Sequence, residues 1–175
     1  MKIVHICLAS LVIDGWSYQD NLLPKYHKKM GHEVYIITSK WIRNIKGELI
    51  LDNRQHYIND DGVEIFRLSM KNKENFNNKF KKFYNIYETI DCIKPEILFI
   101  HSVSFCDISL IVRWLKNNMN VTVFADNHAD FSNSATTWLS KNILHKIIWR
   151  YYAKKLIPYV KKILGGIACK SKIFI

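Results

Sequence analysis

The sequence lacks the glycine-rich loops that mark many nucleotide-binding and hydrolase sites. It has six glycines in 175 residues, and none of them belongs to a G-x-G-x-x-G, G-x-x-x-x-G-K-[ST] or G-x-S-x-G pattern. These patterns let backbone amides approach phosphates, or expose a nucleophilic serine. Their absence argues against a dinucleotide-dependent oxidoreductase, a P-loop nucleotidase and an α/β-hydrolase.

Long apolar runs and paired cysteines are missing too. No stretch reaches the roughly 18 apolar residues of a membrane-spanning helix. His5 and Ser10 interrupt the first apolar run, which therefore predicts a strand rather than a signal peptide. No C-x-x-C pair is present, and Cys7, Cys92 and Cys106 lie in or beside apolar runs. This favours buried, reduced thiols in a cytoplasmic protein over a disulfide framework or a zinc site.

Acidic residues are absent from the last part of the chain. Asp130 is the last carboxylate, and nine lysines and arginines follow it, which leaves the preceding residues nearly neutral. Such a segment fits an anionic membrane surface, a nucleic acid, a phosphorylated substrate, or a solvated face beside an acidic partner domain. Lys146, Arg150 and Lys154 recur every four residues and are expected to share a helical face. The aromatic residues near these charges are Trp149, Tyr151 and Tyr152. Their spacing fits core positions better than stacking platforms, which disfavours nucleic acid.

The sequence does contain an alternation of buried strands and amphipathic helices. Apolar runs predict strands at 2–8, 34–38, 96–100 and 121–124, with helical patterns between them and a longer helix at about 139–157. Asn59-Asp60-Asp61-Gly62 predicts a hairpin turn before the strand 63–68. The order predicts a single α/β domain over 1–175, with a Rossmann-like parallel sheet and helices on both faces.

Local signals predict the ends and buried faces of these helices. Ser17 is expected to cap the first helix, Pro24 to kink it and Gly31 to end it. Ser104 and Asp107 resemble a capping box for a later helix. Its apolar positions are Ile108, Ile111, Val112 and Leu115. The apolar stripes expected for the two earlier helices are Tyr18, Leu22, Tyr26 and Met30, and Phe76, Phe80, Phe83, Tyr84, Tyr87 and Ile90.

A polar cluster directly after the strand 121–124 is the first candidate for a functional site. It contains Asp126, His128 and Asp130, at the carboxyl end of a strand, where open α/β sheets bind ligands. His101 ends the preceding strand at the same edge and is expected to support the site. The cluster could also hold a metal, but the chain offers too few further ligands, so no metal is predicted. Turn capping by the carboxylates and a structural loop imidazole at His128 are the remaining alternatives.

Five segments in order resemble the start of a glycosyltransferase of family 4, which has the GT-B architecture. They are Gly15-Trp16-Ser17-Tyr18-Gln19-Asp20-Asn21, Gly31-His32-Glu33-Val34 with Ile37-Thr38-Ser39, Asp60 to Leu68, Lys94-Pro95-Glu96-Ile97 with His101, and Asp126-Asn127-His128-Ala129-Asp130. The resemblance runs from residue 1 to about 164, whereas 165–175 have little family character.

The resemblance implies the N-terminal, acceptor-binding half of a GT-B fold. The family transfers a sugar from a nucleotide-sugar to an acceptor, with retention at the anomeric carbon. A second domain holds most of the donor nucleotide, and its E-x7-E motif is not in these residues, so the chain alone is expected to be inactive. The resemblance implies that His128 contacts the transferred sugar as the catalytic residue. It implies donor or acceptor contacts for Gly15, Trp16, Ser17, Tyr18, His101, Asp126 and Asp130. No covalently bound cofactor is expected, because the nucleotide-sugar is a co-substrate.

The implied partners are a polysaccharide or lipid-linked sugar acceptor and a separate donor-binding domain. The basic positions Lys146, Arg150 and Lys154 would then face an anionic membrane or a lipid-diphosphate acceptor. This places the protein in the cytoplasm, peripheral to the inner face of the membrane. The alternatives are a non-catalytic membrane- or acceptor-binding subunit of a two-chain glycosyltransferase, and a nucleic-acid-binding α/β module.

Overall fold

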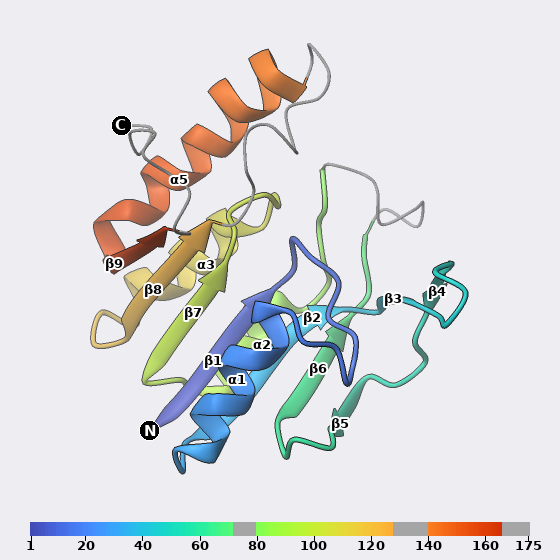
Figure 1. Ribbon diagram of the computed structural model, residues 1–175. Coiled ribbons are helices and arrows are strands. Elements are labelled where there is room, and N and C mark those ends of the chain that lie inside the picture. Colours follow the sequence, from blue (N-terminus) through green and yellow to red (C-terminus); the bar gives the residue numbers. More distant parts are fainter. Residues whose placement is uncertain (72–79, 128–139, 166–175) are drawn as a thin grey trace.

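The computed structural model describes residues 1–71, 80–127 and 140–165 (Figure 1). Their main feature is a seven-stranded sheet in the order β5-β6-β2-β1-β7-β8-β9. All neighbours pair in parallel except β5 and β6, which form an antiparallel edge pair. The strands are β1 Lys2–Cys7, β2 Glu33–Ser39, β5 His56–Ile58, β6 Glu64–Leu68, β7 Ile97–His101, β8 Thr122–Asn127 and β9 Val160–Gly165. A separate hairpin joins β3 Trp41–Arg43 to β4 Leu49–Leu51.

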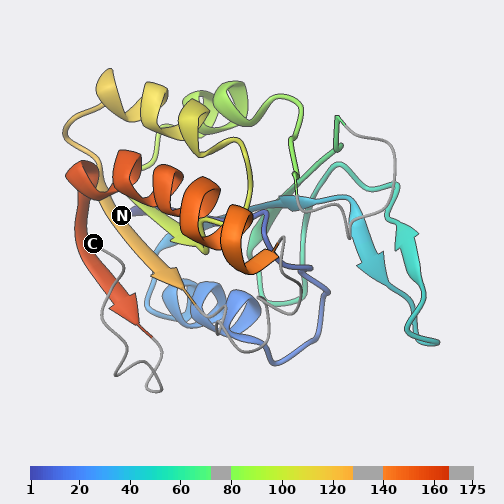
Figure 2. The same ribbon diagram turned by 90° about the horizontal axis from the view of Figure 1, so that it is seen from above.

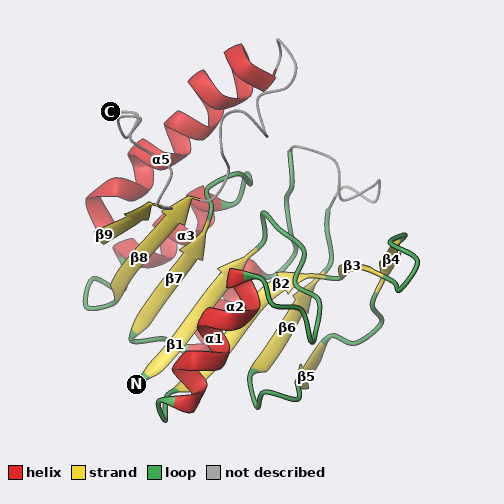
Figure 3. Ribbon diagram, in the orientation of Figure 1, coloured by secondary structure: helices red, strands yellow, loops and turns green. Residues whose placement is uncertain are grey.

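Helices cover both faces of this sheet, which confirms the predicted Rossmann-like α/β fold (Figures 2 and 3). Helix α1 (Gln19–Lys29) lies on one face, and α2 (Ile86–Ile93), α3 (Ile108–Lys116) and α5 (Arg150–Leu156) lie on the other. Residues of β1 alternate between the two layers, as a strand flanked on both sides requires. Val4 and Ile6 enter the core that includes α2 and α3, whereas Cys7 packs in a smaller cluster with Val34 and Ile36.

The order in which the strands join the sheet indicates where a ligand site is expected. From β1 the chain proceeds outward to β2 and β6, and it then returns to the other side of β1 to form β7, β8 and β9. The strand order therefore reverses between β1 and β7. Such a reversal opens a crevice at the carboxyl ends of the two strands, and ligands of open α/β sheets bind in it.

The predicted hairpin before β6 is present. The side-chain oxygen of Asn59 accepts hydrogen bonds from the amides of Asp61 and Val63, and Gly62 has φ +74°. The turn connects β5 to β6, which pair antiparallel, as the Asn-Asp-Asp-Gly pattern predicted.

The predicted buried face of α1 is wrong. Tyr18, Tyr26 and Met30 are exposed, whereas Asn21 and Pro24 are buried. The sheet carries polar side chains beneath this helix, so the polar side of α1 faces inward. Tyr18 occupies the N-cap position and no side chain caps the helix, so the role given to Ser17 is wrong too. Helix α1 continues through Pro24, so the helix is not split at this proline. Gly31 ends the helix region as predicted, with φ +83°.

The two following helices agree in part with their predictions. Helix α2 starts only at Ile86, and Phe80 and Tyr84 lie before it as exposed residues, while Phe76 lies outside the described residues. The four predicted apolar positions of α3 are all buried. The capping box is wrong, because the Asp107 carboxylate accepts a hydrogen bond from the Phe83 amide instead of capping α3.

The predicted basic helix is present in three parts. A π-helical segment, η1 (Ser140–Trp149), continues into α5 and a 3₁₀ turn, η2 (Ile157–Tyr159). Strand β9 then pairs in parallel with β8, and the sequence did not predict it. Cys7 and Cys106 are buried as expected, but Cys92 is exposed on α2. None of the helices in the described part of the chain is both long and apolar enough to cross a bilayer.

Candidate functional site

Polar side chains from four segments meet where the strand order reverses. Cys7 ends β1, His101 ends β7, and Asp126 lies beside His101 in the register of β8. Asp20 reaches them from the first turn of α1. Residues at alternate positions on parallel neighbours share a face, so these strand ends point toward α1 rather than toward α2 and α3. The parallel sheet thereby gathers two carboxylates, an imidazole and a thiol at its carboxyl edge, where a ligand site is expected, and all of them except Asp20 are buried there.

His101 lies between two carboxylates. Its Nδ1 is 3.0 Å from Asp126 Oδ2 and 3.2 Å from Asp20 Oδ1, and its side chain is almost fully buried. Neither contact has the alignment of a hydrogen bond, so the attraction is that of an ion pair shared by two acids. Burial alone would lower the pKa of His101, but Asp126 and Asp20 outweigh it and raise this pKa to about 9. At neutral pH His101 is therefore an imidazolium that ties α1 to the β7–β8 pair.

Two further histidines continue from His101 beneath α1. His101 Nε2 is 3.0 Å from His5 Nδ1, and His5 Nε2 is 3.0 Å from His27 Nδ1. Burial and the neighbouring His101 and His27 hold the pKa of His5 well below its usual value. Burial, His32 and His101 also lower the pKa of His27. Because His101 is protonated at both nitrogens, it donates to His5, and neutral His5 must then carry its proton on Nε2 and donate to His27.

Cys7 completes a group of metal-binding size. Ligand atoms of Cys7, Asp20 and His101 all lie within 4.8 Å of one another. Burial, together with Asp20 and Asp126, raises the pKa of the Cys7 thiol well above its usual value, so the sulfur keeps its proton. Since His101 Nδ1 is already engaged by both carboxylates, the group is stable as a protonated, ion-paired cluster.

The loop between β1 and α1 carries four of the predicted binding residues. Trp16 and Tyr18 are 41% and 62% exposed, and their ring centroids are 5.4 Å apart. Gly15 has φ +79°, and no atom lies within 4 Å of the place a Cβ would occupy, which leaves open space for a ligand. Ser17 is exposed beside them. The loop therefore presents an exposed aromatic pair next to a glycine with free space.

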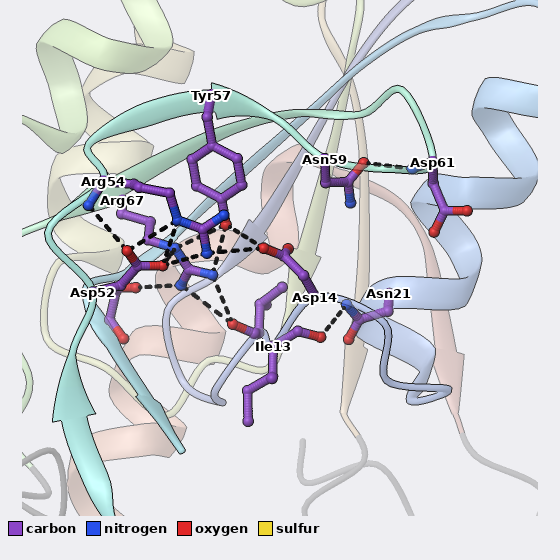
Figure 4. A network of polar contacts seen from close by, with 11 residues as sticks. Ile13, Asp14, Asn21, Asp52, Arg54, Tyr57, Asn59, Asp61 and Arg67 are labelled. Atoms are coloured by element: carbon purple, nitrogen blue, oxygen red, sulfur yellow. Dashed lines mark hydrogen bonds and ion pairs between the residues drawn. The ribbon is translucent and has the colours of Figure 1, made fainter. Parts of the chain in front are cut away.

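A buried polar network fixes this loop to the sheet (Figure 4). The Arg67 guanidinium donates to the Val12 carbonyl at 3.2 Å and to the Tyr57 hydroxyl at 2.8 Å. It also lies 3.1 Å from Asp52 Oδ2. The hydroxyl of Tyr57 donates to Asp14 at 2.8 Å. Arg67 has no exposed side-chain surface, so these contacts hold Val12 and Asp14 rigidly at the base of the loop.

The structure brings some of the predicted site residues together and separates others. His101 and Asp126 are in contact, and Gly15 to Tyr18 lie on the loop that joins β1 to Asp20. Ser10 of the same loop donates a hydrogen bond to Asp20. His128 and Asp130 lie outside the described residues. Lys146 and Lys154 are exposed on the η1–α5 segment, but Arg150 is half-buried, so the three do not form one equally exposed face. Trp149 is buried and Tyr152 half-buried as expected, whereas Tyr151 is 53% exposed.

The sequence reasoning missed His5, Cys7, Asp20 and His27 as site residues. His5 was part of a run that predicted a fully buried strand, and His27 and Asp20 were polar positions of a helix. One signal was present: His5 and Cys7 lie two residues apart in β1, so both point to the same face of the sheet.

A scan against models of known protein families gives no match, and a search of curated proteins gives none either.

Proposed function

We propose that this chain is the acceptor-binding domain of a retaining glycosyltransferase, the activity that its sequence motifs resemble. The observation that carries the proposal is the position of the polar cluster at the β1–β7 reversal, next to an exposed aromatic pair. Open α/β sheets bind small polar ligands at this position. The proposal assigns the crevice to a sugar and the loop 8–18 to its outer wall.

The groups in the crevice suit carbohydrate recognition. Carboxylates accept hydrogen bonds from sugar hydroxyls, and Asp20, whose side chain is partly exposed, supplies such a group, while the buried Asp126 holds the same imidazole from the other side. Aromatic rings offer flat apolar faces with a polar tip, and Trp16 and Tyr18 present theirs to solvent. A sugar has both kinds of surface, hydroxyls at its edge and C–H groups on its faces.

The charge of the crevice suits the chemistry of sugar transfer. Two carboxylates surround a single imidazolium, so the cluster is more negative than positive. Transfer at an anomeric carbon passes through a state in which the sugar ring gains positive charge, and fixed negative groups nearby stabilise such a state. His101 is a positioning residue in this scheme, because its ion pairs hold both carboxylates in place.

The donor is expected to be a nucleotide-sugar that acts as co-substrate. Gly15, with open space at its Cα, would let the loop backbone approach the donor phosphates. The role of His128 next to the reacting carbon stays a prediction from the sequence.

Binding to a panel of immobilised glycans tests the proposal. Trp16→Ala and Tyr18→Ala should each weaken binding by roughly tenfold, because a stacked aromatic ring contributes on the order of 1 kcal/mol. Tyr26→Ala is a matched control, since Tyr26 is equally exposed but lies on the outer face of α1. If the panel gives no binding, or if all three variants bind like the parent chain, the site is not a carbohydrate site.

A further inference from the structure

A second hollow lies between the η1–α5 segment and the residues that precede α2. Its volume is about 500 Å³, in the range of small-molecule sites. Its lining residues are Phe80, Lys82, Cys106, Ile147, Ile148, Tyr151 and Tyr152. We call it the η1 groove. All but one of these side chains are apolar or aromatic, so the groove favours an apolar ligand.

Three of the lining side chains are large, apolar and open to solvent. Phe80 is 45%, Ile147 61% and Tyr151 53% exposed. Isolated exposed apolar residues are common, but a group that lines one hollow marks a binding surface. An apolar chain lying in the groove would remove these surfaces from water.

Positive charge lies in the groove and on the helical segment that forms one of its walls. Lys82 lines it and is exposed, and Lys146, Lys154 and Lys155 are exposed along the helical wall. The Lys155 Nζ lies 4.4 Å from the ring centre of Tyr151. Residues 140–165 contain no carboxylate. The carboxylate near Lys82 and Lys71 belongs to Asp107, which is buried and accepts a hydrogen bond from the Phe83 amide. The rim of the groove therefore suits an anion.

The groove wall is connected to the crevice at the strand-order reversal. The amine of Lys81, next to Lys82, donates a 2.6 Å hydrogen bond to the carbonyl of Ala9. Ala9 precedes Ser10, which donates to Asp20 in the crevice. The Lys81 carbonyl in turn accepts a hydrogen bond from the amide of Cys106, a lining residue. These hydrogen bonds link the groove wall to the loop beside the polar cluster at the carboxyl edge of the sheet.

We propose that the η1 groove binds a single-chain lipid phosphate, with its chain against Phe80, Ile147 and Tyr151 and its phosphate against the lysines of the rim. The proposal rests on the proposed function in one respect: the lipid phosphate would carry the acceptor sugar. A nucleic acid would need base-stacking faces along a charged track. The lining instead combines aliphatic with aromatic side chains in one hollow, which fits a hydrocarbon chain.

Titration calorimetry with dodecyl phosphate, below its micelle concentration, tests the lipid site without any sugar. Dodecyl dimethylamine oxide, with the same chain, no net charge and no sugar, and inorganic phosphate, with no chain, are the comparison ligands. Dodecyl phosphate should bind at least about tenfold more tightly than either, because only it uses both the apolar lining and the charged rim. Ile147→Asp and Lys82→Glu should each weaken binding by roughly tenfold or more. Met119→Asp and Lys46→Glu are matched controls, exposed positions that do not line the groove.

Two results would overturn the proposal. The first is equal binding of dodecyl phosphate to the groove variants and to the parent chain. The second is equal affinity for dodecyl phosphate and inorganic phosphate, which would make the groove a plain anion site. Trp16 does not line the groove, so the Trp16→Ala variant should bind dodecyl phosphate as the parent chain does. A failure of the carbohydrate site would appear in the glycan panel, and a failure of the lipid site would appear in the dodecyl phosphate titration.

Discussion

Replacing Asp126 with asparagine should reduce the loss of unfolding free energy that the parent chain shows as the pH rises above neutral. Asp126 is one of the two carboxylates that keep His101 protonated, and its Oδ2 lies 3.0 Å from His101 Nδ1. Asparagine has nearly the same shape but no charge. The imidazolium would then retain only Asp20 as its counter-ion, and its pKa should fall toward the usual value of 6.5.

The magnitude follows from the linkage between pKa and stability. In the folded chain the pKa of His101 is raised from 6.5 to about 9. A shift of this size corresponds to about 3 kcal/mol of unfolding free energy, on the order of 1.4 kcal/mol per pKa unit. Because the folded-state pKa is raised, this contribution is fully present below the unfolded value of 6.5 and is lost as the pH rises to about 9. Removing one of the two carboxylates should abolish roughly half of it, ~1–2 kcal/mol.

Other groups titrate nearby with the opposite sign. The lowered pKa values of His5 and His27 make the folded chain less stable as the pH falls below 6.5. Burial lowers the pKa of Lys81 to about 8, so Lys81 adds stability as the pH rises above that value. The difference between the parent chain and Asp126→Asn cancels the contribution of Lys81, whose pKa is lowered by burial alone. His5 and Cys7 respond to the substitution, because His101 contributes to the lowered pKa of His5 and Asp126 to the raised pKa of Cys7.

Urea unfolding at a series of pH values measures this difference. The two curves should lie farthest apart near and just below pH 6.5 and converge above about pH 9, where His101 has lost its proton in both chains. Asp61→Asn is a suitable control, because Asp61 pairs with Lys25 at the surface and does not approach His101. Parallel curves for Asp126→Asn and the parent chain over the whole alkaline range would refute the ion-pair account of His101.

Three further predictions concern the loop anchor, a turn and the histidine chain. Arg67→Met should lower the unfolding free energy by about 3 kcal/mol or more in urea titrations, because it removes the buried donor of the Val12 and Ser39 carbonyls and leaves Arg54 as the partner of Asp52; a loss below ~1 kcal/mol would contradict the anchoring role. Gly31→Ala should cost about 1 kcal/mol in the same assay, because φ is +83° and no neighbour within 4 Å adds a clash, and an unchanged midpoint would contradict this. Nitrogen-15 NMR of the imidazole rings should show neutral His5 with its proton on Nε2, and a proton on Nδ1 would contradict the direction of the chain of hydrogen bonds.

The fold was largely predictable, because buried strands and intervening helices produce strong periodic signals. The β1–β2 crossover, the hairpin at Asn59 and the buried side of α3 all follow from local sequence. Strand β9 was not predicted, because Lys161 and Lys162 interrupt its short apolar run and only pairing with β8 stabilises it as a strand. The orientation of α1 was mispredicted for a related reason: the helix turns its polar side to the sheet, and only the tertiary structure shows that the sheet is polar there.

The candidate site was predictable only at the strand ends. His101 and Asp126 follow apolar runs, and the strand-end rule located both correctly. Asp20 and His27 lie on a helix whose apolar stripe pointed the wrong way, and His5 lies inside a strand that seemed uniformly buried. The contacts that bring the histidines together are long-range: His5 and His101 are 96 residues apart in sequence, and His5 and His27 are 22 apart, so no local pattern could reveal them.

NMR mapping of a bound sugar tests the central claim most directly. Titration of the purified chain with the best glycan from the panel should perturb the amide signals of Ser10, Trp16, Tyr18, His101 and Asp126, and Asp126→Asn should weaken the binding. The account predicts that these perturbations group around the β1–β7 reversal and leave Met119 and Tyr26 unchanged. Perturbations confined to other surfaces, or binding that Asp126→Asn does not affect, would contradict the assignment of this crevice as the functional site.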